Sequence, residues 1–354
     1  MTSVHQFHPV LTPADAMSDH VFALRARLRE WGYDAQAYCV EAKPGVEGEA
    51  RSYRELFRTL RPEDTLVMHF SMGHPVFDEL AKIPARRVLV FHNVTPPDFF
   101  VGINPHAAAH ARLGLRQLAK LAPSIDLAIG VSEFDRQGLE SAGYTKTATV
   151  PILIDWSRYD VEPDPDVRAL LAGIHTKLLF VGRISPHKRQ DDLIRMLAYY
   201  RRCIDPEAIL ILVGSHRDQP QYYARLRALA EQLGLSGAVR FTGMIPLASL
   251  VAYYRSASCF ISLSEHEGIG IPLLESMYLG TPVVAYAAAA IPETAENAAL
   301  LLPKKDLAEA AEACAILNED LGYRGTLIDA GHQRVKSFDA EKIAARTKEV
   351  LELS

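Results

Sequence analysis

The chain has 354 residues, of which 49% are hydrophobic and 23% are charged; it is too long for one ordinary core, so two domains of roughly 150–180 residues are expected. The formal net charge of −5 supplies no basic field, which argues against nucleic acid as the main partner. No apolar run reaches the ~18–20 residues of a membrane span, and the first residues lack the basic and apolar regions of a signal peptide.

Short apolar runs alternate with amphipathic segments along the whole chain. In the first half, strands are predicted at residues 65–70, 86–94 and 126–132, and helices at 20–32 and 106–120. In the second half, strands are predicted at residues 178–183, 208–214, 238–243, 258–264 and 281–286, and helices at 221–234 and 273–280. Strands that are apolar on both faces and alternate with helices predict an α/β architecture of parallel sheets covered by helices.

The segment 150–171 separates two such blocks. It holds several prolines with acidic residues between them, a composition typical of a linker. We therefore expect an N-terminal domain at residues 1–155 and a C-terminal domain at residues 156–338. A last amphipathic helix, within residues 339–354, follows the second block and can pack back on the first domain.

The stretch 265–286, EHEGIGIPLLESMYLGTPVVAY, contains a glycine-rich turn beyond the carboxyl end of a predicted strand. Pro272 suits the first position of a helix, and Gly280 suits its C-terminal cap. The N-terminus of a helix gathers free N–H groups and the positive end of the helix dipole. The turn is therefore predicted to receive an anion, which its glycines allow to approach closely.

Two glutamates stand eight positions apart around this turn. Glu275 falls in the first turn of the predicted helix, and its oxygens, which only accept hydrogen bonds, suit a vicinal diol such as ribose. Glu267 lies on the loop nearer the anion, and because a carboxylate repels phosphate we expect it to hold sugar hydroxyls. Taken alone, a glutamate early in a helix is better explained by capping or by the helix dipole, so the functional interpretation depends on the joint pattern.

A neighbouring strand end supplies cations. In VGRISPHKR, Gly182 ends a strand, so Arg183 and Lys188 follow at the carboxyl edge of the sheet. Two fixed positive charges at that edge suit a diphosphate leaving group. A solvated loop is the alternative interpretation, and it is the one we adopt for Arg189.

The order and spacing of GRISPHK, FTGMIP and EHEGIGIPLLESMYLGTPVVAY resemble the C-terminal half of the retaining glycosyltransferases of family four. FHNVTPPDFF and DLAIGVSEF resemble the N-terminal half, so the likeness covers nearly the whole chain. It implies the GT-B fold, in which two Rossmann-like domains have parallel sheets that face each other across a cleft. The E-x7-E motif combined with GRxxxxK is specific for this family.

The resemblance implies that Arg183 and Lys188 bind the donor diphosphate and that Glu275 binds the nucleotide ribose. It implies that Glu267 contacts the donor sugar and that His92 lies near the reacting sugar. The further implied donor contacts are Gly182, Gly243, Met244, Gly268, Ile269 and Gly270, with Gly243 and Met244 against the base. In such enzymes the departing phosphate oxygen takes the acceptor proton, and neither an enzyme nucleophile nor a metal or other cofactor is implied.

The sequence departs from the family pattern in two loops. Many members have paired glycines after the first strand, but here that loop is FHPVLTPADAMSDH, without glycine. The usual glycines before IPE are replaced in YAAAAIPET. Both changes bear on the phosphate and acceptor contacts, and Gly73, which follows a later strand, is a candidate for the acceptor side.

Other candidate sites are better explained structurally. The DPD at 164–166 could suggest metal binding, but it lies in the linker before a helix rather than at a strand end. His106 and His110 could share a helix face, but no third ligand accompanies them, so zinc is disfavoured. His69 ends a strand and is equally explained as a satisfied core group. Scattered cysteines without CxxC favour free thiols in a reducing cytoplasm: Cys39, Cys203, Cys259 and Cys314.

We therefore interpret the chain as a retaining, metal-independent glycosyltransferase that moves a sugar from a nucleotide-diphosphate donor to an acceptor hydroxyl. A GDP-mannose type donor is favoured, and UDP- and dTDP-sugars stay open. The resemblance suggests a glycan or lipid-linked acceptor in polysaccharide or glycolipid assembly. A nucleotide-sugar epimerase or hydrolase and a catalytically silent nucleotide-binding subunit are the alternatives, whereas a dehydrogenase is disfavoured because no GxGxxG follows the first strand.

A membrane contact is the last expectation. Residues 106–120 combine basic and apolar side chains at helical spacing, and such a helix can lie on an anionic membrane surface. An ordinary amphipathic surface helix is the alternative. The expected location is the cytoplasm, with peripheral contact at the inner membrane surface.

Overall fold

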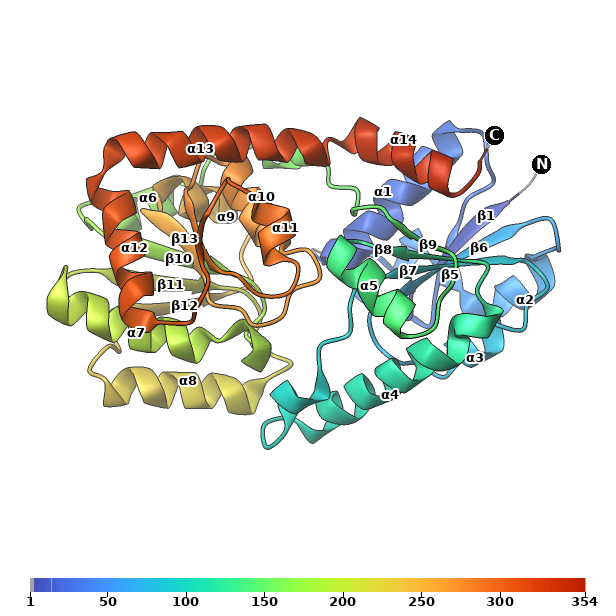
Figure 1. The fold of residues 1–354 in the computed structure, drawn as a ribbon, viewed down its shortest axis with the longest axis horizontal. Coiled ribbons are helices and arrows are strands. Elements are labelled where there is room, and N and C mark those ends of the chain that lie inside the picture. Colours follow the sequence, from blue (N-terminus) through green and yellow to red (C-terminus); the bar gives the residue numbers. More distant parts are fainter. Residues whose placement is uncertain (1–2, 14, 354) are drawn as a thin grey trace. The chain divides into compact units, whose positions relative to one another are not determined.

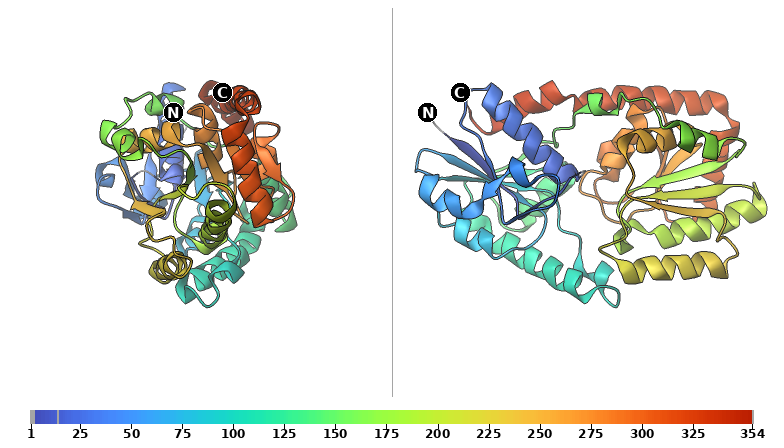
Figure 2. Two further views of the ribbon diagram at one scale, coloured as in Figure 1. Left: turned by 90° about the vertical axis from the view of Figure 1, so that its left-hand side faces the viewer. Right: turned by 180° about the vertical axis from the view of Figure 1, so that it is seen from behind.

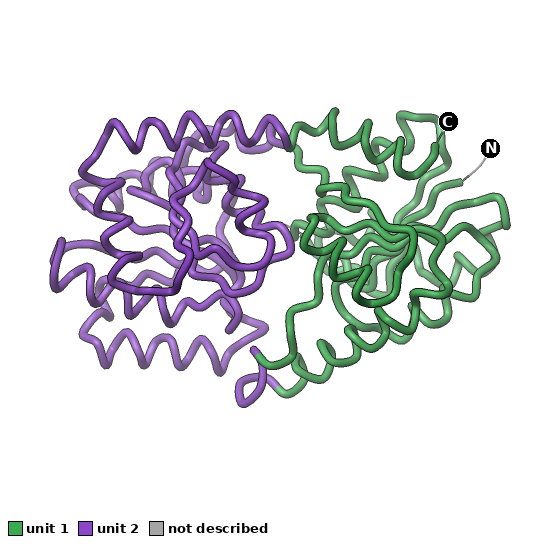
Figure 3. Tube along the Cα trace, in the orientation of Figure 1, with its two compact units in different colours: residues 1–98, 105–155, 338–354 green, residues 99–104, 156–337 purple. Residues whose placement is uncertain are grey.

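The computed structural model describes residues 3–13 and 15–353; the parts of our N-terminal expectations that rest on residues 1, 2 and 14 lie outside these ranges. The chain divides into two compact units (Figure 3). Unit 1 comprises residues 1–98, 105–155 and 338–354, and unit 2 comprises residues 99–104 and 156–337. The short segment Phe99–Asn104 thus belongs to unit 2, although its chain neighbours on both sides belong to unit 1.

Unit 1 is built on a parallel sheet with the strand order β5-β3-β1-β6-β7-β8-β9. Its strands are β1 (Val4–Phe7), β3 (Ala37–Cys39), β5 (Arg51–Ser52), β6 (Thr65–Phe70), β7 (Arg86–Phe91), β8 (Leu127–Gly130) and β9 (Thr147–Thr149). β2 (Val10–Leu11) and β4 (Glu41–Ala42) form a separate parallel pair. Every residue of β6 is buried, as expected for a parallel strand covered on both faces.

Helices lie on both faces of the unit 1 sheet (Figures 1 and 2). They are α1 (Ala16–Glu30), α2 (Leu56–Thr59), α3 (Val76–Leu80), α4 (Pro105–Leu121), α5 (Glu133–Ser141) and α14 (Ala340–Val350). The C-terminal residues of the chain are held to this unit, because Glu352 pairs with Lys146 at 3.0 Å and with Arg86 at 3.3 Å. Aromatic rings of Phe7, Phe70 and Phe77 meet in the core, with ring centroids 4.7–5.4 Å apart.

Unit 2 has a second parallel sheet, with the strand order β12-β11-β10-β13-β14-β15. Its strands are β10 (Lys177–Val181), β11 (Ile209–Val213), β12 (Val239–Gly243), β13 (Cys259–Ser262), β14 (Val283–Tyr286) and β15 (Leu300–Leu302). Its helices are α6 (Pro165–Leu171), α7 (Gln190–Cys203), α8 (Pro220–Gln232), α9 (Leu247–Ser256), α10 (Ile271–Tyr278), α11 (Ile291–Ala295), α12 (Leu307–Glu319) and α13 (Leu321–Val335). The core packs β10, β11 and β13 against α7, α8 and α12.

The strands and helices predicted from the sequence are confirmed, with ends that differ by a few residues. β6 occupies the predicted residues 65–70, and β13 occupies the middle of the predicted range 258–264. Cys39, Cys259 and Cys314 are buried free thiols as expected, whereas Cys203 is exposed.

The loop after β6 packs directly on α4. A Cβ on Gly73 would lie 2.5 Å from the backbone nitrogen of Gly114 in α4, so a glycine is needed for packing. The side chain of Gln117 also accepts from the His74 N–H and donates to the His74 carbonyl, both at 2.9 Å. Gly73 therefore has a packing role, and its place on the acceptor side stays a prediction.

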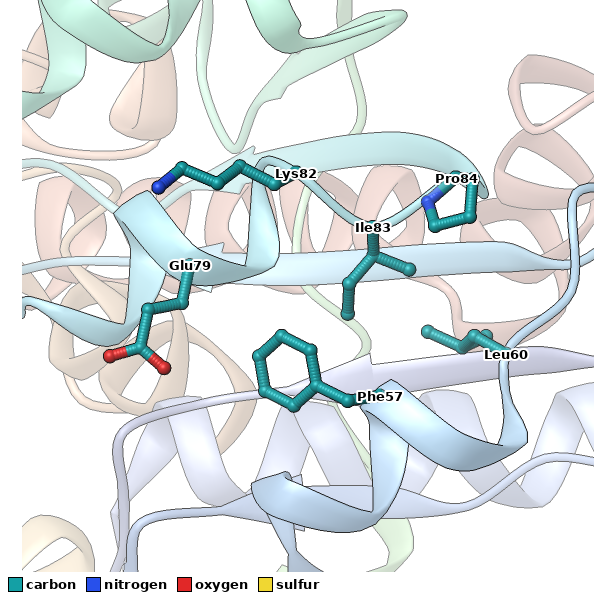
Figure 4. A pocket seen from close by; sticks show the side chains of 6 residues that line it. All are labelled: Phe57, Leu60, Glu79, Lys82, Ile83 and Pro84. Atoms are coloured by element: carbon teal, nitrogen blue, oxygen red, sulfur yellow. The ribbon is translucent and has the colours of Figure 1, made fainter.

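An open hollow of about 390 Å³ lies between α2 and α3 in unit 1 (Figure 4). Its lining residues are Phe57, Leu60, Glu79, Lys82, Ile83 and Pro84. Leu60 precedes β6 and Pro84 precedes β7, so the hollow lies at the amino ends of these strands. Because parallel α/β sheets bind ligands at the carboxyl ends of their strands, the candidate site lies elsewhere.

Candidate functional site

Four loops at the carboxyl ends of β10, β11, β12 and β13 form the candidate site in unit 2. The backbones of two of them approach closely, because a Cβ on Gly214, after β11, would lie 2.1 Å from the carbonyl oxygen of Gly182, after β10. Gly214 has a φ of +142°, which glycine adopts without strain. The Gly214 N–H donates to the Gly243 carbonyl at 3.0 Å, so the loops after three neighbouring strands are held together.

The loops after β10 and β13 are joined by an ion pair. Lys188 Nζ lies 2.5 Å from Glu267 Oε2, and the two side chains are only 16% and 10% exposed. The backbone repeats this link, since the Glu265 N–H donates to the His187 carbonyl at 2.9 Å. The structure therefore brings together two of the predicted residues, one basic and one acidic, in a largely desolvated contact.

Arg183 is the exposed cation of the site. Its side chain has no hydrogen-bond or ion-pair partner within residues 3–13 and 15–353. Its backbone carbonyl is fixed by Gln190 Nε2 at 3.0 Å, and Gln190 is fully buried. A guanidinium on an anchored backbone but without a protein partner is available to an anionic ligand.

Glu275 lies one residue further into α10 than the sequence predicted. The helix begins at Ile271 rather than at Pro272, so Glu275 is its fifth residue and the first turn contains no acidic group. The Tyr159 hydroxyl donates to Oε1 at 2.5 Å and the Tyr254 hydroxyl donates to Oε2 at 2.7 Å. Burial raises the pKa of Tyr254 well above its usual value, and the adjacent carboxylate adds to this effect. Glu275 is thus an oriented acceptor rather than a helix cap.

The turn before α10 has the backbone geometry that its glycines indicated. Gly270 has a φ of +73° immediately before the helix, and Gly280 has a φ of +74° just after it. The turn is held from α11, whose Thr294 hydroxyl donates to the Ile269 carbonyl at 2.6 Å. Pro272 lies in the first turn, where its missing N–H costs no hydrogen bond. The N-terminus of α10 is therefore a preformed place for an anion.

The loop before α11, in which alanines replace the usual glycines, keeps a conformation that favours glycine. Ala289 has a φ of +51°, a region that costs an alanine about 1–2 kcal/mol. The neighbouring Ala290 N–H donates to the Glu267 carbonyl at 3.3 Å. This loop therefore contacts the turn of Glu267 through its backbone.

The end of β12 presents an exposed apolar surface. Met244 is 60% exposed, and Gly243 before it has a φ of +69°. Nearby in the sheet order, His216 follows β11 and its ring stacks on Tyr223 with centroids 4.1 Å apart. A flat apolar edge of this kind suits the face of a nucleobase.

Arg189 is not the solvated loop residue that the sequence suggested. Its guanidinium pairs with Asp191, Asp192 and Glu265 at 3.0–3.5 Å, and its side chain is 30% exposed. Lys305 also pairs with Asp192 and Glu265. This charged cluster holds the base of the loop that carries Glu267, and no local sequence pattern indicated it because Lys305 comes from a distant segment.

In unit 1, histidines gather at the carboxyl edge of the sheet. His69 Nδ1 and His92 Nε2 are 3.0 Å apart, and His20 of α1 completes a group whose nitrogens lie within 4.8 Å of one another. Burial lowers the pKa of His20 to about 4, and burial together with neighbouring histidines lowers the pKa of His69 and of His92 well below 6.5. His69 is a fully buried group with both ring nitrogens bonded, which confirms the core interpretation.

The structure explains two segments that could have suggested a metal site. Asp164 of the DPD caps α6 by accepting from the Asp166 N–H, and it also accepts from the Ser249 hydroxyl at 2.6 Å. His106 and His110 both lie exposed on α4 and belong to no cluster of potential metal ligands found in the described residues. Neither segment holds the geometry of a metal site.

Residues 170–334 match the sequence model of the family Glycosyl transferases group 1. A relative in Mycolicibacterium smegmatis, the GDP-mannose-dependent alpha-(1-6)-phosphatidylinositol monomannoside mannosyltransferase, is 33% identical over 198 residues, which cover 52% of this chain and 49% of the relative. The chain thus spans about half the length of the curated relatives it matches.

Solved structures extend the likeness to the whole fold. Anabaena HepE, solved in complex with UDP-glucose, superposes with a TM-score of 0.80 at 20% identity over 99% of this chain and 100% of that one. The sucrose-phosphate synthase of Thermosynechococcus elongatus gives a TM-score of 0.78 at 19% identity, over 99% and 98% of the two chains. The chain has the GT-B fold, with two Rossmann-like parallel-sheet units, which confirms the predicted fold class.

Several residues that shape the candidate site were not found from the sequence. Tyr159 comes from the linker and Tyr254 from α9, and neither belongs to a motif. In unit 1, Gln6 of β1 contacts His69, and His20 of α1 joins His69 and His92 in the histidine group. These contacts depend on distant segments of the chain, so no local spacing could have indicated them.

Acidification is expected to destabilise unit 1. His20 binds fewer protons in the folded state than in the unfolded state between pH 6.5 and about 4, so its contribution is present above pH 6.5 and is lost as the pH falls through this window. The loss for His20 alone is at most about 3 kcal/mol. The pKa values of His8, His69 and His92 are also lowered, and these groups act in the same direction.

Urea unfolding between pH 7 and pH 4.5, followed by Trp31 fluorescence in a Trp156→Phe background, measures this effect. Trp31 lies in unit 1 and Trp156 in unit 2, so the signal reports unit 1. His20→Gln, whose side-chain oxygen can still accept a hydrogen bond, is the control and should show a shallower dependence. A urea midpoint that does not change with pH in the parent protein would contradict the expectation.

Proposed function

We propose that the chain is a retaining glycosyltransferase that transfers a sugar from a nucleoside-diphosphate donor, of the GDP-mannose type, to an acceptor hydroxyl. The observation that carries the proposal is the arrangement at the carboxyl edge of the unit 2 sheet. There an unpartnered Arg183, the Lys188–Glu267 pair and the N-terminus of α10 converge on the loops after β10 and β13. The family match over residues 170–334, which contains all of these residues, supports it.

The donor base is argued from the relatives. The mycobacterial relative is named as GDP-mannose-dependent at 33% identity, whereas HepE, which was solved with UDP-glucose, is 20% identical. The higher identity favours guanine over uracil. The exposed edge around Met244 and His216 is the part of the site that we assign to the base.

The chemistry follows from where charge develops. Breaking the bond between the sugar C1 and the β-phosphate oxygen leaves negative charge on the diphosphate, and Arg183, Lys188 and the N–H groups of α10 offset that charge. The new bond from the acceptor oxygen to C1 forms on the same face of the sugar, and the acceptor proton passes to the departing phosphate oxygen. We assign Glu267 to the donor sugar, Glu275 to the ribose, and His92 of unit 1 to a sugar hydroxyl.

A panel of nucleotides and nucleotide sugars tests this proposal. Thermal shift with GDP, UDP, dTDP and ADP identifies the base, and a ligand at 100 times its Kd stabilises by about 2.7 kcal/mol. Product analysis with the matching nucleotide sugar and a lipid-linked or glycan acceptor follows. Transfer with the same anomeric configuration supports the proposal. An isomerised donor without acceptor indicates an epimerase, a released sugar a hydrolase, and binding without turnover a silent subunit.

Activity is expected to persist in excess chelator. The charge of the leaving diphosphate is met by Arg183, Lys188 and a helix N-terminus, so the proposal needs no divalent ion. Initial rates with and without EDTA, on protein that was dialysed against chelator, provide the measurement. A complete loss that manganese or magnesium restores would reject this account of the phosphate site.

We also propose that α4 contacts anionic membrane surfaces peripherally, on the cytoplasmic side, where a lipid-linked acceptor would lie. Among the described residues, no helix is both long and apolar enough to cross a membrane. α4 buries one face and exposes Arg112, Arg116 and Lys120, together with Leu115, which is 41% exposed. Lys120 is paired with Asp78 at 3.1 Å, so the two arginines carry most of the free charge.

Vesicle binding is therefore expected to depend on these residues and on salt. Wild type should sediment with vesicles rich in anionic lipid and be released as salt rises, because charge is screened over about 10 Å at 0.1 M. Replacing Arg112, Arg116 and Lys120 with serine should abolish binding and leave nucleotide affinity unchanged. A matched control replaces Arg202 and Arg227, which are exposed on helices of unit 2. Equal binding by wild type and the triple variant would reject the proposal.

A further inference from the structure

The histidines of unit 1 form a chain of hydrogen bonds that runs from the backbone to His92. Gln6 Nε2 lies 3.0 Å from the Val21 carbonyl, Gln6 Oε1 lies 2.9 Å from His69 Nε2, and His69 Nδ1 lies 3.0 Å from His92 Nε2. A bond between two neutral imidazoles needs one N–H and one lone pair. The order of partners along the chain therefore decides which nitrogen of each ring carries the proton.

The direction of the chain is set at Gln6. The Val21 carbonyl can only accept, so the amide NH₂ of Gln6 faces it and the amide oxygen faces His69. His69 Nε2 must then carry the hydrogen, which leaves a lone pair on His69 Nδ1. That lone pair accepts from His92 Nε2–H. Gln6 and His69 are both fully buried, so bulk water offers neither side chain an alternative hydrogen-bond partner.

This assignment leaves His92 with an unprotonated Nδ1. Within the parts of the chain that the structure describes, Nδ1 has no hydrogen-bond partner, and the His92 ring is only half-buried. The titratable groups that face it are His69 on β6, His20 on α1 and His8 after β1. Burial, and then His20 and His8, hold the pKa of His92 well below 6.5, so the ring stays neutral near pH 7.

We propose that Gln6 and His69 are positioning residues that hold His92 in the tautomer with a lone pair on Nδ1, so that His92 accepts a hydrogen bond from a substrate hydroxyl. The identification of that hydroxyl as one of a sugar rests on the proposed function. A phosphate oxygen, which only accepts, would face the same lone pair and be disfavoured. This chain of hydrogen bonds thus favours a sugar hydroxyl over the diphosphate as the partner of His92.

A metal ion is the other ligand that three neighbouring histidines suggest, and the same bonds oppose it. His20 Nδ1 accepts from the Leu153 N–H at 2.9 Å, so the His20 proton resides on Nε2. The lone pair of His69 Nδ1 is already used by His92. A zinc ligand must offer a free lone pair. Two of the three rings would have to give up a buried hydrogen bond to bind zinc.

The variant Gln6→Met tests the hydrogen-bond chain from Gln6 through His69 to His92. Methionine fills a similar volume but offers no acceptor to His69 Nε2–H, so the two histidines can reverse their shared bond and place the proton on His92 Nδ1. Gln117→Met is the matched control, since Gln117 is also a buried amide of unit 1 and bonds the His74 backbone in both directions. Two-bond ¹H–¹⁵N correlation spectra of the full chain with labelled histidine report each tautomer.

The spectra are expected to show His92 protonated at Nε2 in wild type and in Gln117→Met, and a shift toward Nδ1–H in Gln6→Met. Sugar transfer by Gln6→Met should show a kcat about tenfold lower, the loss expected for one hydrogen bond, with affinity for the bare nucleoside diphosphate within about twofold. Gln6→Glu restores an acceptor for His69. It should recover the Nε2–H tautomer, and its negative charge should move the acid limb of the pH profile upward.

Three results would overturn the inference: Nδ1–H on His92 in wild type, an unchanged tautomer in Gln6→Met, or a kcat for Gln6→Met no lower than that of Gln117→Met. One equivalent of zinc that stays bound through gel filtration, and is lost in His20→Gln, would also overturn it. Failure of the proposed function is a separate result. If wild type transfers no sugar from any donor, the proposed function is rejected. The tautomers of His92 in wild type and Gln6→Met still test the hydrogen-bond chain in that case.

Discussion

Glu267→Gln is expected to reduce sugar transfer by about 100-fold or more while it tightens the binding of the bare nucleoside diphosphate. In the free protein the carboxylate of Glu267 neutralises Lys188 at 2.5 Å, and both side chains are largely shielded from water. Removing the negative charge frees Lys188 for the diphosphate, so affinity should rise several-fold rather than stay constant. Turnover should fall because the carboxylate acts on the sugar, where charge changes in the transition state, and lost electrostatic stabilisation there costs about 10²–10³ in kcat.

A neighbouring glutamate provides the matched control. Glu265 lies two residues away on the same loop and pairs with Lys305 and Arg189 instead of Lys188. Glu265→Gln should therefore keep both turnover and diphosphate affinity within about threefold of wild type, even where stability falls. Arg183→Ala should lose affinity and turnover together, because it meets the diphosphate before and during departure. Calorimetry and donor turnover on the three variants decide the roles, and near-normal turnover of Glu267→Gln would remove Glu267 from the site.

The fold was predictable because its signals are local and repeated. Apolar runs such as residues 65–70 became strands at the predicted positions, and Gly280 ended α10 with the positive φ that its glycine indicated. The position of Glu275 within α10 was wrong because the helix gains a residue at Ile271 before the proline. A proline at the first or second helical position lacks no needed hydrogen bond, so the sequence alone does not separate the two starts.

The candidate site was predictable only where a motif carried it. Arg183, Lys188, Glu267 and the turn at residues 268–270 stand in short stretches that the resemblance covers, and the structure places them on loops of one sheet edge. The surrounding contacts were not predictable, because they join segments far apart in sequence. Lys305 reaches Glu265 across 40 positions, and Tyr159 reaches Glu275 across 116. Such pairs are specified by tertiary packing and leave no periodic pattern.

Two tyrosine hydroxyls hold the buried carboxylate of Glu275, which we assign to the ribose. They occupy one lone-pair direction on each carboxylate oxygen, at 2.5 and 2.7 Å, and a carboxylate has about four such directions. The tyrosines thus fix the plane of the carboxylate, and a ribose diol is the ligand that we assign to it. The alternative is that Glu275 serves only the tyrosines, so a test must separate binding from stability.

Glu275→Gln is expected to weaken diphosphate binding by roughly 10- to 100-fold, the loss of a charged acceptor worth about 1.5–3 kcal/mol. The sharper expectation concerns the 2′-deoxy nucleoside diphosphate. Wild type should bind it more weakly than the ribonucleotide, whereas Glu275→Gln should bind the two nearly alike, because the group that reads the 2′-hydroxyl is gone. Comparing both ligands on both proteins by calorimetry isolates the contact from any general damage to the site.

A variant that replaces all three polar side chains, Glu275, Tyr159 and Tyr254, is the control for effects on stability. Glu275→Ala alone removes the carboxylate that accepts from the hydroxyls of Tyr159 and Tyr254, and each lost hydrogen bond to a charged group costs about 1.5–3 kcal/mol. Glu275→Leu combined with Tyr159→Phe and Tyr254→Phe leaves no orphaned hydroxyl, so it should unfold at a urea midpoint near that of wild type and still fail to distinguish ribose from deoxyribose. If Glu275→Gln keeps the wild-type preference for ribose, the glutamate serves only the tyrosines, and the ribose contact must be assigned to another residue.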